Sequence, residues 1–225
     1  FQDKYKNIIS PKDDGIWLLN METEHYELIL SLNQINDFLS ITNNTKRCID
    51  YVNHLRFSPG NNRLYFYYVW KYGKNNLDRK IFPLVYDLIS KELNLITKEN
   101  ISHECWKDDD NLMLWSNDSK CYNLYNFVED SVIPYYKELL QEDGHPSFIG
   151  EDEFLTDTYP DKMGYQYLLH LKDKKEVLGK FHVPYELNGE IRCDLHPRFS
   201  LNKKKIAVDI FHNHSRKICV IDLYE

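Results

Sequence analysis

The sequence predicts an all-β fold of the β-propeller class, and two observations carry this prediction. A histidine followed three residues later by an aromatic, then by a polar turn and an apolar strand, occurs four times, at spacings of 49, 42 and 51 residues: His54/Phe57, His103/Trp106, His145/Phe148 and His196/Phe199. A polar turn and an apolar strand follow each pair, and strand-only repeats of roughly 40–50 residues are typical of propeller blades. Aromatic residues also make up 14% of the chain, and Ala207 is its only alanine, which favours sheets over helices.

Each repeat predicts a blade of four antiparallel strands, the first of which begins at the histidine. The second strands are expected at 63–70, 112–116, 153–159 and 205–211, and the third at 83–88, 123–127, 165–171 and 217–223. Fourth strands are expected at 93–97, 133–139 and 177–182. Ile206, Val208 and Ile210 alternate onto one face, which indicates a strand with one buried side.

The two ends of the chain predict incomplete blades. Residues 15–21 and 26–32 resemble the third and fourth strands of a partial first blade, and 33–50 predicts a long loop between blades. The last repeat has no fourth strand. The partial sets of strands at the two ends do not add up to one blade. We therefore expect residues upstream of Phe1 in the natural protein. No linker or low-complexity tract appears, so a single domain over 1–225 is predicted.

Composition narrows the class of protein. The formal net charge of −7 argues against a nucleic-acid binder. No apolar run approaches the roughly 20 residues of a membrane-spanning helix. Five cysteines, an odd number without a Cys-x-x-Cys motif, fit a reducing compartment, so a cytoplasmic location is expected. A glycine-rich phosphate loop and a Gly-x-Ser-x-Gly elbow are both absent. Oligomeric state is left unassigned.

The four histidines are the leading candidate site. Equivalent positions in successive blades surround one axis, so symmetry brings His54, His103, His145 and His196 toward one another. Imidazole is the commonest neutral metal ligand, which predicts a divalent-metal site. The alternative is that each histidine caps a turn or bonds a neighbouring blade. His54 follows a break in the series of blades, so it is the histidine least expected to bind the common ion. The aromatic of each pair lies on the opposite strand face and is expected in the core between blades.

Several polar residues near the last two histidines are further candidates. Asp157 and Asp209 end equivalent strands and either orient a histidine or cap a turn. Arg192 and Arg198 flank His196 and are suited to binding a carboxylate, with exposed ion pairing as the alternative. His212 and His214 have a workable chelating spacing, although a solvated turn explains them equally well.

Two segments, 143–148 (Asp-Gly-His-Pro-Ser-Phe) and 194–200 (Asp-Leu-His-Pro-Arg-Phe-Ser), resemble the oligogalacturonate lyase family. Its members carry His-Pro-x-Phe-(Ser/Thr) at the start of a blade, and a looser likeness extends over about 50–223. The resemblance implies a seven-bladed ring with manganese in the central channel, held by several histidines and a glutamine. It also implies β-elimination on uronate oligomers. Asp194 stands where the family has a further histidine, and no glutamine precedes His196 closely.

On this resemblance we expect a divalent ion, Mn²⁺ foremost and Zn²⁺ as the alternative, at the histidines. The ion would bind the uronate carboxylate while a base removes the C5 proton. Arg192 and Arg79 are the candidate catalytic residues, and Arg198, Asp157 and Tyr159 the candidate substrate-binding residues. The expected partner is a uronate-containing oligosaccharide.

Two other functions stay open at this point. A non-catalytic propeller could bind glycan or protein in polysaccharide metabolism, with its histidines only joining blades. A hydrolase could use Asp157 and Asp209 as paired carboxylates, which requires a carboxyl separation within about 10 Å.

Overall fold

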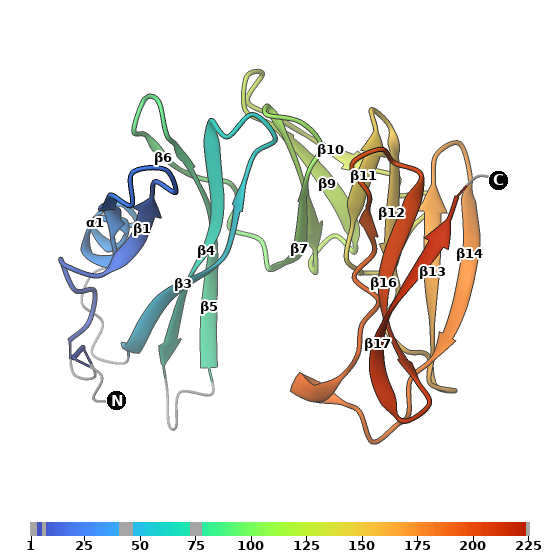
Figure 1. Cartoon of the computed structure of the whole chain (residues 1–225). Helices are drawn as coiled ribbons and strands as arrows, with labels where there is room; N and C mark the ends of the chain where they lie inside the picture. The colour runs from blue at the N-terminus through green and yellow to red at the C-terminus, as the bar shows by residue number, and fades with distance from the viewer. Residues whose placement is uncertain (1–3, 6–7, 41–46, 73–77, 224–225) are drawn as a thin grey trace. The chain divides into compact units, whose positions relative to one another are not determined.

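The structure is a computed structural model that describes residues 4–5, 8–40, 47–72 and 78–223. Nearly all regular structure in these residues is β, in five antiparallel sheets with one short helix (Figure 1). Four sheets follow one another along the chain as meanders, which is the blade arrangement of a β-propeller. The predicted fold class is confirmed.

Each sheet takes its strands from one continuous stretch of chain. The first contains β1 (Gly15–Leu19) and β2 (Tyr26–Ser31). The second contains β3 (Arg47–Phe57), β4 (Arg63–Tyr72), β5 (Asp78–Asp87) and β6 (Leu93–Leu95). The third contains β7 (Ile101–Trp106), β8 (Asn111–Ser116), β9 (Cys121–Asn126) and β10 (Ser131–Tyr135). The fourth contains β11 (Ser147–Gly150), β12 (Glu153–Asp157), β13 (Tyr165–Leu171) and β14 (Lys175–His182). The last contains β15 (Arg198–Phe199), β16 (Lys205–His212) and β17 (Ser215–Asp222). A short 3-10 helix, η2 (Gly189–Ile191), precedes it.

Two predictions about local structure are wrong. Residues 33–50 are not one loop, because α1 (Leu32–Phe38) fills their first part and β3 begins at Arg47. Ser31 and Gln34 form a capping box that starts this helix. The first strand of a blade also does not start at its histidine. His54 and His103 lie inside β3 and β7 beside register shifts, and His145 and His196 precede their strands by two residues.

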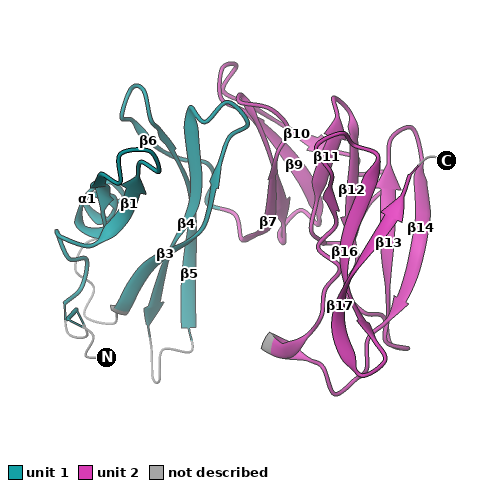
Figure 2. Ribbon diagram, in the orientation of Figure 1, with its two compact units in different colours: residues 1–98 teal, residues 99–225 magenta. Residues whose placement is uncertain are grey.

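The chain divides into two compact units, residues 1–98 and 99–225 (Figure 2). In the first unit, α1 and the β1–β2 hairpin share an apolar core with the sheet β3–β6, through residues such as Ile35, Phe66 and Leu84. Buried Asp50 also accepts hydrogen bonds from the Ser10 hydroxyl at 2.7 Å and the Tyr68 hydroxyl at 2.7 Å, which ties the N-terminal segment to this sheet.

The second unit holds three blades with two cores. One core packs β8 and β9 against β12 and β13, around Met113, Tyr122 and Phe154. The other packs β12 and β13 against β16, around Leu155 and Ile206. The aromatics of the histidine repeat behave as predicted in this unit, since Trp106 is buried and Phe148 and Phe199 pack against the cores. Phe57, in the first unit, departs from the prediction and is 43% exposed.

No helix in the described part of the chain is long and apolar enough to cross a membrane.

Candidate functional site

Three of the four histidines form one group, which we call the histidine cluster: His103, His145 and His196. The ring centroids of His103 and His145 are 4.2 Å apart, and those of His145 and His196 are 3.8 Å apart. The three come from the starts of successive blades in the second unit, as the repeat predicts. His54 lies in the first unit, where its ring is 4.7 Å from that of Tyr67.

Asp157, at the end of β12, organises two members of the cluster. Its side chain is 1% exposed. One oxygen accepts a hydrogen bond from the His145 backbone N–H at 2.7 Å, and the other from the His196 backbone N–H at 3.0 Å. The Nδ1 of His145 lies 2.9 and 3.0 Å from the two oxygens. Burial alone would raise the pKa of Asp157, but the bonds from His145 outweigh it and the pKa is lowered.

Gly144 makes this arrangement sterically feasible. A Cβ atom at this position would lie 1.9 Å from the backbone oxygen of Asp157, closer than any real contact. Only glycine therefore lets the segment before His145 approach the end of β12 closely enough for the carboxylate to reach both histidines.

Asp143 fixes the ring of His103. Its carboxylate lies 2.9 Å from His103 Nδ1, and the hydroxyl of Tyr159 lies 3.2 Å from Nε2. Burial lowers the pKa of His103, but the Asp143 carboxylate more than compensates, so the pKa is raised above its ordinary value of 6.5.

His196 has the opposite electrostatic character. Its ring is the exposed member of the cluster, and Nδ1 lies 3.3 Å from the backbone oxygen of Asp194. A carbonyl can only accept, so Nδ1 donates and Nε2 keeps its lone pair. Burial, followed by the neighbouring His145, lowers the pKa of His196 below 6.5. His196 is therefore neutral at neutral pH.

The cluster meets some requirements of a metal site but not all. Carboxylates that accept from Nδ1 are typical partners of metal-ligating histidines, and Asp143 and Asp157 have this position. However, among the residues that the structure describes, no group of three or more His, Cys, Asp or Glu side chains is placed to hold an ion. The rings of His145 and His196 are inclined to each other by 35° with their centroids 3.8 Å apart, so they pack against each other. The imidazoles are therefore the kind of side chain that binds metal ions, but in the described residues they are not placed to hold one ion together.

Tyr159 and Arg192 border the cluster. The Arg192 guanidinium lies 4.4 Å above the centre of the Tyr159 ring and is held by the Asp194 carboxylate through two bonds of 2.5 and 2.8 Å. Burial, with the nearby charges of Asp143 and Asp194, raises the pKa of Tyr159 to about 12. The phenol therefore keeps its proton at neutral pH.

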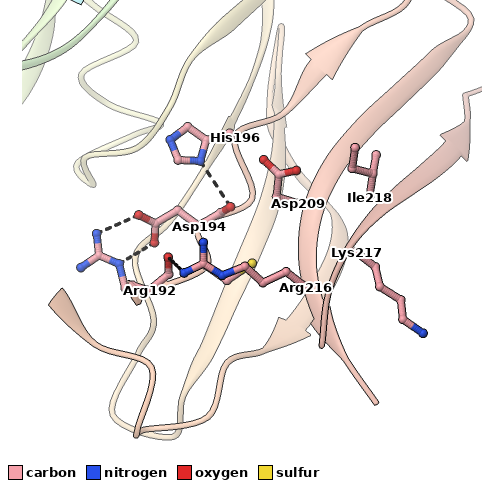
Figure 3. A pocket seen from close by; sticks show the side chains of 8 residues that line it. Arg192, Asp194, His196, Asp209, Arg216, Lys217 and Ile218 are labelled. Atoms are coloured by element: carbon pink, nitrogen blue, oxygen red, sulfur yellow. Dashed lines mark hydrogen bonds and ion pairs between the residues drawn. The ribbon is translucent and has the colours of Figure 1, made fainter. Parts of the chain in front are cut away.

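A cavity of about 360 Å³ adjoins His196 (Figure 3). Its lining residues are Arg192, Cys193, Asp194, His196, Asp209, Arg216, Lys217 and Ile218. Arg216 on β17 reaches across it and donates from Nη2 to the backbone oxygens of Ile191 and, at 3.3 Å, Arg192. Arg216 was not among the residues that the sequence suggested, because its partners are backbone atoms of a distant loop and no motif marks them.

The other predicted site residues lie on other elements or already bind other protein groups. Arg198 pairs with Asp209 at 2.5 Å, which matches the ion-pair alternative for this arginine. Arg79 is exposed on β5 in the first unit. His212 and His214 are exposed at the β16–β17 turn, away from the cluster, and border a separate pocket with His182. Asp157 is too buried to contact a ligand here, which supports the orienting alternative.

Comparison with known proteins identifies the fold. No family model matches the sequence, and no curated protein matches it. The chain is similar to the solved structure of TolB from Acinetobacter baumannii, with a TM-score of 0.59 and 12% identity over 92% of this chain and 46% of that one. It is also similar to oligogalacturonate lyase from Vibrio parahaemolyticus, with a TM-score of 0.56 and 15% identity over 92% of this chain and 54% of that one.

These likenesses define the class of this chain as a β-propeller. The chain spans about half the length of these two structures. At sequence identities of 12% and 15%, the likeness shows the fold alone.

Proposed function

We propose that this chain is a sugar-active propeller protein that binds uronate-containing oligosaccharides at the histidine cluster and cleaves them by β-elimination. The observation that carries the proposal is a neutral imidazole, His196, on the edge of a cavity that contains guanidinium groups. A uronate offers an anionic carboxylate for the cations and an acidic C–H bond beside that carboxylate for the base. The structural likeness to an oligogalacturonate lyase agrees with this substrate class.

The elimination needs one base and one acid. His196 Nε2 accepts the proton from C5, the C4–O bond breaks, and a double bond forms between C4 and C5. The departing sugar oxygen takes a proton from an acid. Tyr159 suits this part because its raised pKa keeps the phenol protonated. The cationic groups of the cavity stabilise the charge that develops on the carboxylate.

We also propose that His103, His145 and His196 bind a divalent ion, Mn²⁺ foremost and Zn²⁺ as the alternative. Neutral imidazoles suit both ions, and a bound ion would supply Lewis-acid stabilisation of the carboxylate. The described donors do not surround a common point, so the base and acid roles are assigned to the chain's own side chains. Elemental analysis of protein purified without a histidine tag tests this part. Less than about 0.3 ion per chain after incubation with Mn²⁺ argues against it.

The activity test uses trigalacturonate and follows the ultraviolet absorbance of the unsaturated product, with and without Mn²⁺. We expect His196→Ala to reduce kcat by about 100- to 10,000-fold, as for loss of a general base. His212→Ala, an exposed histidine outside the cluster, is the matched control and should retain activity. Absence of product from the unaltered protein under both conditions would contradict the lyase proposal.

A non-catalytic glycan-binding propeller is the second candidate. It is favoured by the engagement of the cluster within the protein, since Asp157 joins the segments of His145 and His196 and Asp143 holds His103. Binding of trigalacturonate without product formation would support this candidate.

The cellular setting is proposed from chemistry. Cys121, Cys193 and Cys219 are free thiols, which fits a reducing cytoplasm. The net charge of −7 makes nucleic acid an unsuitable partner.

A further inference from the structure

We propose that Arg216 is the residue that binds the carboxylate of the sugar and makes the cavity selective for free uronates over neutral or esterified sugars. This inference rests on the proposed function and assigns a substrate contact within the same site. The positions of Arg192 and Arg198 beside His196 in the sequence favour these two for that contact, but the partners of the three arginines in the structure point to Arg216.

Charge distinguishes Arg216 from the other two arginines. Arg192 is bound by Asp194 through two hydrogen bonds, and Arg198 is bound by Asp209. A guanidinium that already holds a carboxylate has its charge neutralised and its planar fork occupied. Across the described residues, no carboxylate is paired with Arg216. Its partners are two backbone carbonyl oxygens, which are neutral acceptors, so its full positive charge is available to an anion.

The Arg216 side chain is also pre-organised. Both carbonyls bind the same nitrogen, Nη2, and they come from the turn formed by η2 and the residue after it. A guanidinium has five N–H donors in a fixed plane, so Nη2 anchors the group while Nε and Nη1 remain for a ligand. The long side chain is thereby held in one direction before any ligand arrives, which lowers the entropic cost of binding.

Arg216 and His196 also line the same cavity. Figure 3 shows the Arg216 guanidinium extending toward Arg192 and Asp194, on the side of the cavity where His196 lies, whereas Lys217 leads away from this group. A carboxylate on Arg216 would keep the adjacent sugar ring in the cavity of about 360 Å³ that His196 borders. The C–H bond next to the carboxylate is the one that a base must reach in β-elimination.

The experiment measures binding of two ligands to two proteins by isothermal titration calorimetry. The ligands are trigalacturonate and its fully methyl-esterified form, and the proteins are the unaltered chain and Arg216→Gln. We expect the unaltered protein to prefer the free acid by about 10- to 100-fold, the effect of a hydrogen-bonded charge pair. We expect Arg216→Gln to bind both forms with similar, weak affinity. Arg216→Lys keeps the positive charge but loses the planar set of guanidinium N–H donors. This variant should prefer the free acid over the ester to an intermediate degree.

Lys205→Gln is the matched control, because it removes one positive charge from the same sheet outside the cavity and should keep the preference within twofold. Unchanged thermal unfolding midpoints of the variants establish that the fold is retained. Should Arg216→Gln keep the full preference for the free acid, the assignment of Arg216 is wrong while the proposed function stands. Should the unaltered protein bind neither ligand, the proposed function is wrong, and this inference with it.

Discussion

The same histidine repeat has two different outcomes in the two units. In the second unit His145 contacts both His103 and His196, and carboxylates hold the rings of His103 and His145. In the first unit His54 carries the same sequence signature but lies in the exposed last part of β3, beside Tyr67. The repeat therefore determines where a histidine stands in its blade, and in the second unit buried carboxylates fix the rings of two of the three neighbouring histidines.

The largest test of this comparison removes the carboxylate that joins two histidines. Asp157→Asn should destabilise the protein by about 3–5 kcal/mol, because the amide has one acceptor oxygen where the carboxylate has two, so the buried backbone N–H of His145 or of His196 loses its partner. Urea unfolding measures the change. Asp209→Asn, which loses only an ion pair with exposed Arg198, should cost less than about 1 kcal/mol. Equal losses of unfolding free energy in the two variants would mean that the buried contacts of Asp157 stabilise the fold no more than an exposed ion pair does.

The next test changes the backbone that lets Asp157 reach the histidines. Gly144→Ala places a methyl group 1.9 Å from the Asp157 backbone oxygen, so the segment must shift. We expect a loss of about 1–3 kcal/mol in unfolding free energy. Gly150→Ala is the control, since its nearest neighbour would be 3.9 Å away. A Gly144→Ala protein as stable as the Gly150→Ala protein would show that the close approach is unnecessary.

The third test separates members of the cluster by pH. The ring resonances of His103 should titrate above pH 6.5 and those of His196 below it, in a two-dimensional NMR titration of the histidines. The raised pKa of His103 stabilises the fold at low pH, and this contribution is lost as pH rises through that pKa. The lowered pKa of His196 acts in the opposite sense, so stability declines as pH falls below about 6.5.

Asp143→Asn sharpens this test, because it should bring the pKa of His103 down while leaving His196 below 6.5. Identical titration of the two rings in the unaltered protein would rule out the electrostatic difference between them.

The smallest effect is expected in the first unit. His54→Ala changes an exposed side chain and should alter the unfolding free energy by no more than about 0.5 kcal/mol. Trigalacturonate binding should also be unchanged. Loss of binding in this variant would place His54 in the site and remove the contrast between the units.

The sequence was sufficient for the blades and for three histidines that lie together, although it also offered His54, which lies in the first unit. Strand alternation and the recurring histidine define both, because equivalent blade positions converge. Other features depend on contacts that no local pattern encodes. Asp143 reaches His103 across 40 residues, and Arg216 binds the backbone of a turn 24 and 25 residues earlier. The helix α1 did have a local signal, the Ser31–Gln34 capping box, which the polar composition around it obscured.

The two bonds from Asp157 also bear on the order of folding. They join backbone amides that are 51 residues apart, at the entrances of two different blades. Each blade can form from its own hairpins, whereas this link closes only after both are in place. We expect the link to be weak in the folding transition state, so that its loss speeds unfolding more than it slows folding. The histidine cluster would then be completed after the blades that carry it and lost before them.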